Sequence, residues 1–394
     1  MSKKLIDKIF NSYIKKGKLT IELNDGEILS YGEAGDSLPS VTLKVSNEAF
    51  FDEIIASGNL GLGEAFMNNY FVIKEGTLYE FLDILLMNEI DKSINSNPKL
   101  LLSIGARRLK DAVKGKSHNV RRHYDIGFDI FDYMLGDNLA YSCGYQINDD
   151  DSINDLQYQK FQRIIDKLQL KDNDHILDIG CGYGSFLIYA AQHANITGVG
   201  VTNSQQHTDY ANKKIKEKGL SDRIKVICND YTNISGEFDK IASIGMLEHV
   251  PRKEYKTYFG LIKKLLKTSG AALVHAVGCN AKNNDHDPFI QKYIFPNSNQ
   301  PKLSEIAHHV EQADMAIIDV ENIVRHYRPT AKHWLKNFLE NKHKISNDNY
   351  TNEFYRGWEY YLCCCISAAR YSDSSVYQVL INQSHLNGIN YERI

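Results

Sequence analysis

Near the middle of the chain, a short apolar run ends in three alternating glycines. Residues 176–184 read Ile-Leu-Asp-Ile-Gly-Cys-Gly-Tyr-Gly, and an amphipathic segment follows at residues 186–191. This order is typical of a strand, a tight turn and a helix. Because glycine has no side chain, such a turn lets a nucleotide-like ligand approach the backbone closely. We interpret the run as a cofactor site. The alternative is a strand-to-helix turn that needs glycine only for its backbone.

The next apolar segment ends in groups that suit a ribose. Residues 196–203 form a short expected strand that ends in Thr202 and Asn203, 18 residues after the last glycine of the turn. An acid that binds the ribose is usual about 20 residues after such a turn, so neutral groups would hold the ribose hydroxyls here. Gln206 and His207 follow on the next expected helix and are candidates to help them.

A third expected strand leads into an acid and an aromatic residue. Residues 224–231 end in Asp230 and Tyr231. A carboxylate can accept a hydrogen bond from the adenine amine, and an aromatic ring can stack on the adenine face. The alternative for Asp230 is a local turn in which its side chain binds the backbone.

Strands four and five are each followed by an ionisable side chain. Residues 240–246 lead into Glu248, and residues 272–274 lead into His275. Ligands of an open parallel sheet lie beyond the carboxyl ends of its strands, so both side chains should face the cofactor crevice. An acid and a histidine at adjoining strand ends can place or move a proton. A purely structural pair of buried groups remains the alternative.

Composition limits the class of protein and the compartment. The chain has 394 residues, enough for two domains, with a net charge of -3 and therefore no global attraction to nucleic acid. No apolar run approaches the roughly 18 residues that span a bilayer, and the first residues lead into no signal-peptide core. The seven cysteines include no Cys-x-x-Cys pair and three adjacent members, Cys363 to Cys365, so neither a metal site nor a disulfide framework is expected. We expect a cytoplasmic protein.

The chain changes character near residue 120. Strand-like pieces at residues 18–24 and 40–45 and a helical piece at residues 78–87 precede a basic stretch, and strands alternate with helices from residue 174 onward. The basic stretch contains Arg107, Arg108, Lys110, Lys114, Lys116, Arg121 and Arg122 against the single acid Asp111. Such a run is commonly a solvated linker, but each basic residue near an anionic membrane also contributes about 1 kcal/mol of attraction. We expect an accessory domain at residues 1–104, a basic linker at 105–122 and a catalytic domain at 123–394.

Several ordered blocks of the chain resemble one enzyme family. The blocks are residues 120–127 (Val-Arg-Arg-His-Tyr-Asp-Ile-Gly), 139–145 (Leu-Ala-Tyr-Ser-Cys-Gly-Tyr), 247–250, 275–278, 292–296 and 360–362. Together they resemble the cyclopropane-fatty-acyl-phospholipid synthases, which are related to the mycolic acid cyclopropane synthases. The resemblance implies a class I methyltransferase fold, an α/β architecture with a mainly parallel sheet and helices on both faces. It also implies a smaller N-terminal α+β domain associated with lipid.

The same resemblance implies a reaction. An enzyme of this family uses S-adenosylmethionine (SAM) to add a methylene across the cis double bond of an unsaturated acyl chain in a phospholipid. An alkene is a weak nucleophile, so the methyl group must be held in line with it in a site that excludes water. One proton must then leave, and in the family a bound bicarbonate accepts it. The implied ligands of bicarbonate are the backbones of Cys143 and Val277 and the side chains of Glu248, His275 and Tyr327.

The resemblance also assigns the cofactor contacts. Tyr141 and Ser142 would touch SAM, Gly180, Gly182 and Gly184 would lie near its methionine part, Thr202, Asn203 and His207 near its ribose, and Asp230 and Tyr231 at its adenine. Cys365 matches a cysteine that recurs in the family and is a catalytic candidate, although methyl transfer to an alkene needs no thiol and a buried helical cysteine commonly packs. The chain has Phe128 and His207 where the family usually has asparagine and glutamine. A hydrogen bond at the pocket mouth is therefore expected to be absent, and the ribose contact is expected to depend on pH.

The partners and the rival functions also follow from the family. We expect peripheral association with the inner face of the cell membrane, unsaturated phospholipid as substrate, no nucleic acid and a homodimer. One rival is another SAM-dependent methyltransferase of this fold that adds a methyl branch to an acyl chain or methylates a small amine. The other is a lipid-binding module without catalysis, which is disfavoured because Glu248, His275 and Tyr327 are all present.

Overall fold

The computed structural model describes residues 2–113, 127–280, 287–345, 350–383 and 391–393, with backbone only for 106–113. Contacts divide the chain into two compact units. The first unit comprises Met1–Gly127, Asp285–Pro296 and Phe338–Ser372, and the second unit comprises Phe128–Asn284, Asn297–Asn337 and Asp373–Ile394. Much of the expected basic linker, from residue 114, and the His-Tyr-Asp block at 123–125 lie outside the described residues.

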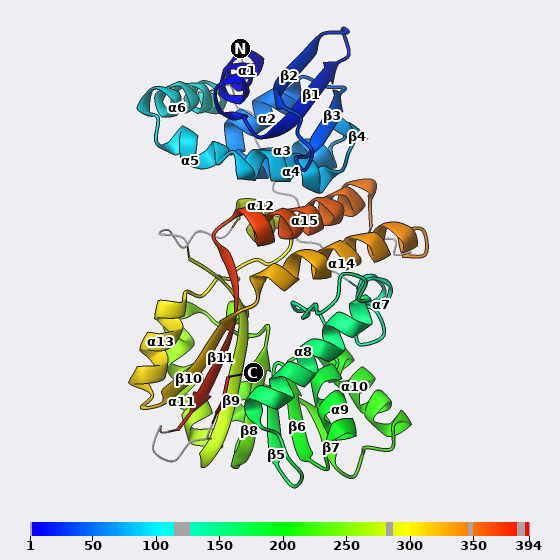
Figure 1. Cartoon of the computed structure of the whole chain (residues 1–394), viewed down its shortest axis with the longest axis vertical. Helices are drawn as coiled ribbons and strands as arrows, with labels where there is room; N and C mark the ends of the chain where they lie inside the picture. Colours follow the sequence, from blue (N-terminus) through cyan, green and yellow to red (C-terminus); the bar gives the residue numbers. More distant parts are fainter. Residues whose placement is uncertain (1, 114–126, 281–286, 346–349, 384–390, 394) are drawn as a thin grey trace. The chain divides into compact units, whose positions relative to one another are not determined.

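A seven-stranded sheet forms the centre of the second unit as described (Figure 1). Its strands are β5 (His175–Ile179), β6 (Thr197–Thr202), β7 (Ile224–Cys228), β8 (Phe238–Ile244), β9 (Leu266–Cys279), β10 (Ala316–Asn322) and β11 (Ser374–Asn382). They are arranged in the order β10-β11-β9-β8-β5-β6-β7. Strands β5 to β9 pair in parallel, whereas β11 is antiparallel to both β9 and β10. This is the mainly parallel sheet that the alternating strands and helices predict.

Helices cover both faces of this sheet, and each face has its own apolar core. On one face lie α8 (Ile153–Leu168), α9 (Ser185–His193) and α10 (Gln205–Glu217), and on the other lie α11 (Tyr255–Leu265) and α13 (Leu303–Gln312). Because both faces are buried, the central strands are apolar on both sides, as in β5, where four of five residues are buried. The unit also contains α7 (Phe128–Met134), the first part of α14 (Tyr327–Asn341) and short 3-10 turns after several strands.

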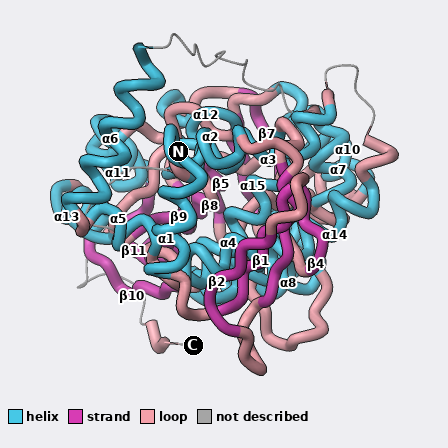
Figure 2. The backbone as a smooth tube through the Cα atoms, turned by 90° about the horizontal axis from the view of Figure 1, so that it is seen from above, coloured by secondary structure: helices cyan, strands magenta, loops and turns pink. Residues whose placement is uncertain are grey.

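The first unit begins with a smaller sheet packed against helices. Its described strands are β1 (Gly17–Leu23), β2 (Ile28–Glu33), β3 (Ser40–Val45) and β4 (Phe71–Glu75), in the order β2-β1-β3-β4. They are magenta in Figure 2, where β2 and β1 lie side by side as an antiparallel pair. Its first helices are α1 (Ser2–Tyr13), α2 (Ala49–Ser57), α3 (Asn59–Met67), α4 (Leu78–Met87), α5 (Ile90–Asn95) and α6 (Pro98–Val113). The strand-like and helical pieces predicted in this part of the chain are confirmed.

Two later segments belong to the first unit by their contacts. They are α12 (Pro288–Tyr293) and α15 (Asn352–Tyr371), and both pack on α3, while α15 also packs on α4. The Ser367 hydroxyl donates to the Tyr79 carbonyl (2.9 Å), and the Arg356 guanidinium donates to the Phe66 carbonyl (2.5 Å). The domain boundaries at residues 104 and 122 stay a prediction. The contacts add that the first unit is not one continuous stretch.

Candidate active site

The glycine turn after β5 has a backbone that only glycine adopts without strain. Gly180, Gly182 and Gly184 have positive φ angles of 76°, 54° and 75°. A Cβ atom on Gly180 would lie 2.5 Å from Cγ of Met246, so the turn packs tightly on one side. A Cβ on Gly182 would meet none of the described atoms within 4 Å. The turn is therefore packed at Gly180 and open at Gly182. A ligand that approaches the backbone needs such an opening.

The expected ribose groups lie where β6 meets α10. Thr202 is buried and its hydroxyl accepts a hydrogen bond from the Ser204 N–H (3.3 Å), while Asn203 is exposed. The Ser204 side chain caps α10 by accepting from the His207 N–H (3.2 Å). The His207 ring packs on Tyr183, with ring centroids 4.3 Å apart. Burial lowers the pKa of His207, so its imidazole is neutral at pH 7.

The expected adenine groups follow β7. One oxygen of the Asp230 carboxylate accepts from the Thr232 N–H (2.8 Å) and hydroxyl (2.7 Å), and these bonds lower the pKa of Asp230. The local turn weighed as the alternative for Asp230 is thus present. Asp230 is exposed, and Tyr231 is half-buried with its ring edge-on to Tyr258. A carboxylate has two oxygens, so capping by Oδ1 is compatible with a ligand contact through the other.

The sequence did not predict an aromatic cluster that lies beside His207. The rings of Phe128, Tyr183 and Tyr210 lie 5.4 to 5.5 Å apart, centroid to centroid. Phe128, which stands where the family usually has a polar residue, packs on the other two rings. Tyr210 follows His207 by three residues, and residues three apart on a helix share a face. This spacing is the sequence signal that places Tyr210 beside His207. Tyr183 was visible as a large residue inside the glycine run.

The segment that contains Tyr141 and Ser142 is held by α8 and α14. The Tyr141 ring packs on Trp334, with centroids 5.1 Å apart. The Ser142 hydroxyl lies 2.7 Å from Nζ of Lys160, and its carbonyl accepts from the Gln157 side chain (3.0 Å). Lys160 and Gln157 are both fully buried. Sequence analysis missed them because a polar side chain on a helix shows its partner only after folding.

Glu248 follows β8, and His275 lies within the neighbouring strand β9. Glu248 is in a 3-10 turn, Leu247–His249, that packs on β9, and its Oε1 accepts from the Val277 N–H (2.6 Å). His275 lies on β9 opposite Ile244, and its carbonyl accepts from the Gly245 N–H (2.8 Å). Glu248 follows β8 as predicted. His275, predicted to follow the fifth strand, lies inside β9, because pairing with β11 extends that strand to Cys279.

A residue outside the predicted set fixes the turn that carries Glu248. The Asn299 N–H donates to the Glu248 carbonyl (2.9 Å), and the Asn299 side chain donates to the Val250 carbonyl (2.8 Å). The Tyr255 hydroxyl in turn donates to Asn299 Oδ1 (2.5 Å). These bonds satisfy carbonyls of the turn and limit its movement. No pattern in the sequence links Asn299 to a turn some fifty residues earlier.

Burial sets the ionisation of Glu248 and His275. Burial raises the pKa of Glu248 to about 7, although the bond from Val277 acts in the opposite direction. Burial lowers the pKa of His275 well below its ordinary value, and the charges of Lys160 and Lys167 lower it further. Glu248 Oε2 and His275 Nε2 are buried and have no hydrogen-bond partner among the described residues. Since buried polar atoms normally have partners, each of the two atoms is a candidate to bind a ligand.

The remaining bicarbonate candidates lie in the same part of the second unit. Cys143 forms a small apolar cluster with Ile323 and Val376, and Val277 and Tyr327 pack against it. His275 and Val277 are two residues apart on β9, so their side chains share a face of the sheet. The Val277 N–H, expected to bind bicarbonate, donates to Glu248 in this structure. An anion there would have to share or replace that bond.

Cys365 belongs to the other unit of the chain. It is buried in α15, next to Cys363 and Cys364, and belongs to the first unit, whereas the other catalytic candidates belong to the second. All seven cysteines are described and free. Burial raises the pKa of the two neighbouring thiols well above the ordinary value, which disfavours reactive thiolates on this stretch of α15.

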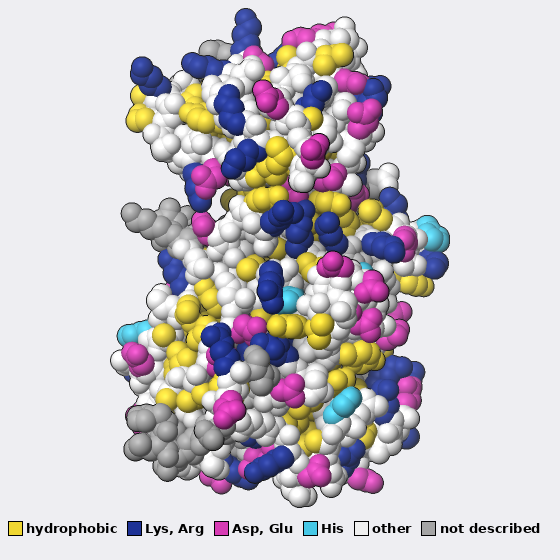
Figure 3. All heavy atoms as spheres, viewed as in Figure 1, with side chains coloured by type: hydrophobic (Ala, Val, Ile, Leu, Met, Phe, Trp, Pro, Cys, Tyr) yellow, Lys and Arg dark blue, Asp and Glu magenta, His cyan; other side chains and the backbone are white. Residues whose placement is uncertain are grey.

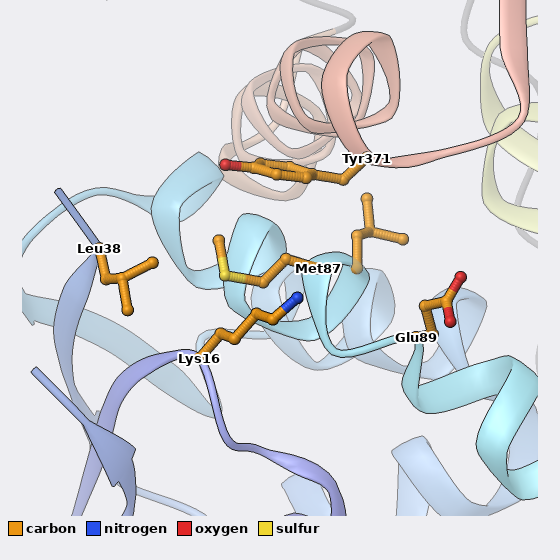
Figure 4. Close-up of a pocket in the computed structure, with 6 residues that line it drawn as sticks. Lys16, Leu38, Met87, Glu89 and Tyr371 are labelled. Atoms are coloured by element: carbon orange, nitrogen blue, oxygen red, sulfur yellow. The ribbon is translucent and has the colours of Figure 1, made fainter. Parts of the chain in front are cut away.

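A cavity of about 390 Å³ lies in the first unit (Figure 4). Its lining residues are Lys16, Leu38, Leu86, Met87, Glu89 and Tyr371. Figure 4 shows Tyr371 and Met87 facing one another across it, from the ends of α15 and α4. None of the predicted site residues is among those that line it. Across the described ranges, no three His, Cys, Asp or Glu side chains cluster as metal ligands, and no helix has the length and apolarity that a bilayer crossing needs.

Comparison with known proteins places this site in a family. A family model described as mycolic acid cyclopropane synthetase matches residues 112–379. The chain is 34% identical over 353 residues to the cyclopropane-fatty-acyl-phospholipid synthase of Escherichia coli K12, covering 89% of this chain and 90% of that protein. It is 27% identical over 386 residues to a "probable fatty acid methyltransferase" of Pseudomonas putida, covering 94% of this chain and 93% of that one.

Solved structures agree on the fold. The cyclopropane synthase MmaA2 of Mycobacterium tuberculosis matches with a TM-score of 0.62 at 23% identity, over 66% of this chain and 95% of that one. The mycolic acid cyclopropane synthase CmaA1 complexed with S-adenosylhomocysteine matches with a TM-score of 0.61 at 24% identity, over 68% and 99%. The predicted class I methyltransferase fold and the predicted family are therefore confirmed. The chain belongs to the mycolic acid cyclopropane synthetase family and is a SAM-dependent methyltransferase.

Proposed function

We propose that the protein adds a methylene group from SAM across the cis double bond of an unsaturated acyl chain in a membrane phospholipid. The observation that carries the proposal is that Glu248 Oε2, just after β8, and His275 Nε2, within β9, are buried and have no partner among the described residues. Identity of 34% to a cyclopropane-fatty-acyl-phospholipid synthase over 89% of the chain supports this acceptor. SAM, when bound, supplies the electrophilic methyl group.

Glu248 and His275 can hold or pass on the proton that the reaction must release. A carboxyl whose pKa is about 7 carries its proton for part of the time at neutral pH, and the neutral His275 ring can donate or accept through Nε2. The apolar cluster of Cys143, Ile323 and Val376 excludes water from one side of the site. Exclusion of water protects a carbocation from capture. These residues therefore suit a reaction in which SAM is a strong electrophile and the alkene is a weak nucleophile.

Bicarbonate is part of the proposal as the group that accepts the proton. Glu248 Oε2 and His275 Nε2 would hold it, with Tyr327 and the backbones of Cys143 and Val277 beside them. A protonated carboxyl donates a hydrogen bond to an anion, whereas a carboxylate would repel it, so the raised pKa of Glu248 fits this role. The bond from Val277 to Glu248 would have to rearrange.

A product analysis tests the proposal. Purified protein is incubated with labelled SAM and vesicles of unsaturated phospholipid, and the fatty acids are then released and separated. We expect a cyclopropane ring product. A methyl-branched product would favour the nearest alternative, which the likeness to the fatty acid methyltransferase of Pseudomonas putida supports over 94% of the chain. Transfer only to a small amine, or none at all, would contradict both acyl functions.

The proposal also covers how the protein reaches the phospholipid in the membrane. We propose that the protein works as a peripheral protein at the inner face of the cell membrane, with the basic stretch at 105–122 drawn to anionic headgroups. The stretch has seven basic residues and one acid, in a chain whose net charge is -3. We also propose a homodimer, in which two copies would bind one membrane together. Sedimentation equilibrium of the purified protein tests the dimer, and a monomer at micromolar concentration would contradict it.

A further inference from the structure

A lysine is completely buried beside the cofactor segment. Lys160 lies in the middle of α8 and has no exposed surface. Lysine is almost never fully buried without partners, because removing an ammonium from water is costly. A methionine would fill the same space without that cost. The charge of Lys160 therefore calls for an explanation beyond packing.

The partners of Lys160 converge on one residue. Its Nζ lies 2.7 Å from Ser142 Oγ and 2.5 Å from Gln157 Oε1. Gln157, one turn earlier on α8 and also fully buried, donates from Nε2 to the Ser142 carbonyl (3.0 Å). Two buried side chains of one helix thus hold both the hydroxyl and the carbonyl of Ser142, which itself lies on no helix or strand.

The structure gives the direction of the hydrogen bond between Lys160 and Ser142. Lys160 Nζ donates to Ser142 Oγ. Burial lowers the pKa of Lys160 to about 7, and in its ammonium form the group has three donors and no acceptor. The hydrogen of the Ser142 hydroxyl is then available for another acceptor. Lys160 also acts electrostatically on Asp178, Cys143 and His275, so its charge is felt across the region where β5 leads into the glycine turn. A positive charge there favours an anionic acceptor.

We propose that Lys160 is a positioning residue that holds the Ser142 hydroxyl as a hydrogen-bond donor to the carboxylate of bound SAM. The inference rests on the proposed function through its cofactor, not through its lipid substrate. SAM has one carboxylate, on its methionine part, which is the part expected near the glycine turn. The competing explanation is that Lys160 only neutralises the buried Asp178, which is 2% exposed. The two explanations differ in whether Ser142 is needed for the effect of Lys160.

A double-mutant cycle separates them. The variants are Lys160→Met, Ser142→Ala and the double variant, and the measured quantity is the Kd for SAM by calorimetry without lipid. We expect Lys160→Met to weaken SAM binding at least tenfold in the parent protein and less than threefold in the Ser142→Ala background. Lys160→Gln keeps an N–H donor and should recover most of the lost affinity. Equal fold-changes in both backgrounds would overturn the proposal, as would unchanged affinity with a lower Tm.

Lys167→Met is the matched control. Lys167 is a second buried lysine of α8, but its Nζ pairs with Glu321 (2.7 Å). We expect this variant to lower Tm and to change the Kd for SAM less than threefold. A loss of SAM affinity equal to that of Lys160→Met would contradict the specific role of Lys160. If Lys160→Met does not fold, Lys160→Leu, which also lacks a donor, is compared in the two backgrounds by the same criterion. Because binding of SAM needs no acyl acceptor, failure of the vesicle assay would leave this test intact.

Discussion

In the proposed reaction, Glu248 is the side chain whose chemistry matters most directly. Its Oε1 is bound by Val277 and its Oε2 is buried without a partner among the described residues. Glu248→Gln keeps the shape but removes the proton that the carboxyl can exchange. We expect turnover to fall about 100-fold or more, the usual size of a general acid or base contribution, while the Kd for SAM changes less than threefold. A comparable loss of SAM affinity would show that Glu248 serves the cofactor instead.

The same substitution has a consequence for stability as a function of pH. Burial raises the pKa of Glu248 from 4.5 to about 7, so the folded state prefers the neutral carboxyl. The stability that this preference contributes is fully present below pH 4.5 and is lost as pH rises through about 7. Glutamine is neutral at every pH. Glu248→Gln should therefore gain stability relative to the parent between pH 5 and pH 8, by about 2 kcal/mol, measured as the difference in thermal unfolding between the two proteins. A constant difference would contradict the raised pKa.

Two glycines of the turn can be distinguished by alanine substitution. Gly180 and Gly182 both have positive φ, so alanine strains the backbone at either, by about 1 kcal/mol. At Gly180 the new methyl also meets Met246, whereas at Gly182 it projects into open space. We expect Gly180→Ala to give the larger loss of Tm, and Gly182→Ala to give the larger loss of SAM affinity per degree of Tm lost.

Gly219→Ala controls for backbone strain alone. Gly219 has a φ of 68°, and no described atom lies within 4 Å of its Cβ position. It precedes β7 and is not among the predicted cofactor residues. We expect a loss of Tm close to that of Gly182→Ala with unchanged SAM affinity, both followed by calorimetry. Equal losses of SAM affinity at Gly182 and Gly219 would contradict the assignment of the glycine turn to the cofactor.

At the scale of residues, the sequence predicted those site residues that follow strands and missed those that act through tertiary contacts. Glu248 comes after an apolar run, and the rule on strand ends located it after β8. The same rule placed His275 after its strand, whereas β9 continues four residues beyond it. Lys160 lies on an amphipathic helix, where a lysine is commonly part of a solvated face. Asn299 lies in a loop with no periodic pattern. A buried polar group is recognised by its partner, and the partner comes from a distant segment.

At the scale of elements, the close contact of α3 with two later helices depends on one glycine. A Cβ on Gly63 of α3 would lie 2.4 Å from the Phe289 ring of α12 and 2.8 Å from the Tyr360 ring of α15. Alanine normally favours a helix over glycine by about 1 kcal/mol. Here the clash outweighs that gain, and we expect Gly63→Ala to destabilise the protein by about 1–3 kcal/mol, seen as a lower Tm.

A second helical glycine provides the comparison. Gly105 lies in α6, and a Cβ there meets no atom within 4 Å in the described part of the chain. We expect Gly105→Ala to raise stability slightly, by up to about 1 kcal/mol. If Gly63→Ala raised Tm as well, the packing of α3 against α12 and α15 would be wrong.

Elements differ in how far the sequence predicts them. The alternation of strands and helices after residue 174 gave the parallel part of the sheet, because each crossover is local. The antiparallel pairing of β11 with β9 joins residues about a hundred positions apart. The packing of α15 on α3 and α4 spans nearly three hundred. Such pairings leave no periodic signal in a single sequence, since each helix shows only that one of its faces is apolar.

At the scale of the whole molecule, the proposed association with a membrane depends on the distribution of charge. Acidic and basic side chains lie close to one another on the face in Figure 3, and the net charge of -3 gives no overall attraction to an anionic surface. Attraction therefore has to come from a local excess of positive charge. The stretch at 105–122 supplies one. Its sequence alone supports this argument, because half of it lies outside the described residues and 106–113 are described by their backbone only.

Neutralising this stretch should weaken vesicle binding in a salt-dependent way. We expect replacement of Lys114, Lys116, Arg121 and Arg122 by glutamine to weaken binding to anionic phospholipid vesicles by at least tenfold at low salt, because each basic residue contributes about 1 kcal/mol near the surface. At high salt the difference should nearly vanish, since screening shortens the reach of the charges. Replacement of Lys213, Lys214, Lys216 and Lys218 on and after α10 changes the net charge equally and is the control. Cosedimentation with vesicles measures the binding of this variant and of the control. An equal loss in the control, or a loss that salt does not change, would show that the basic stretch does not dock the protein electrostatically.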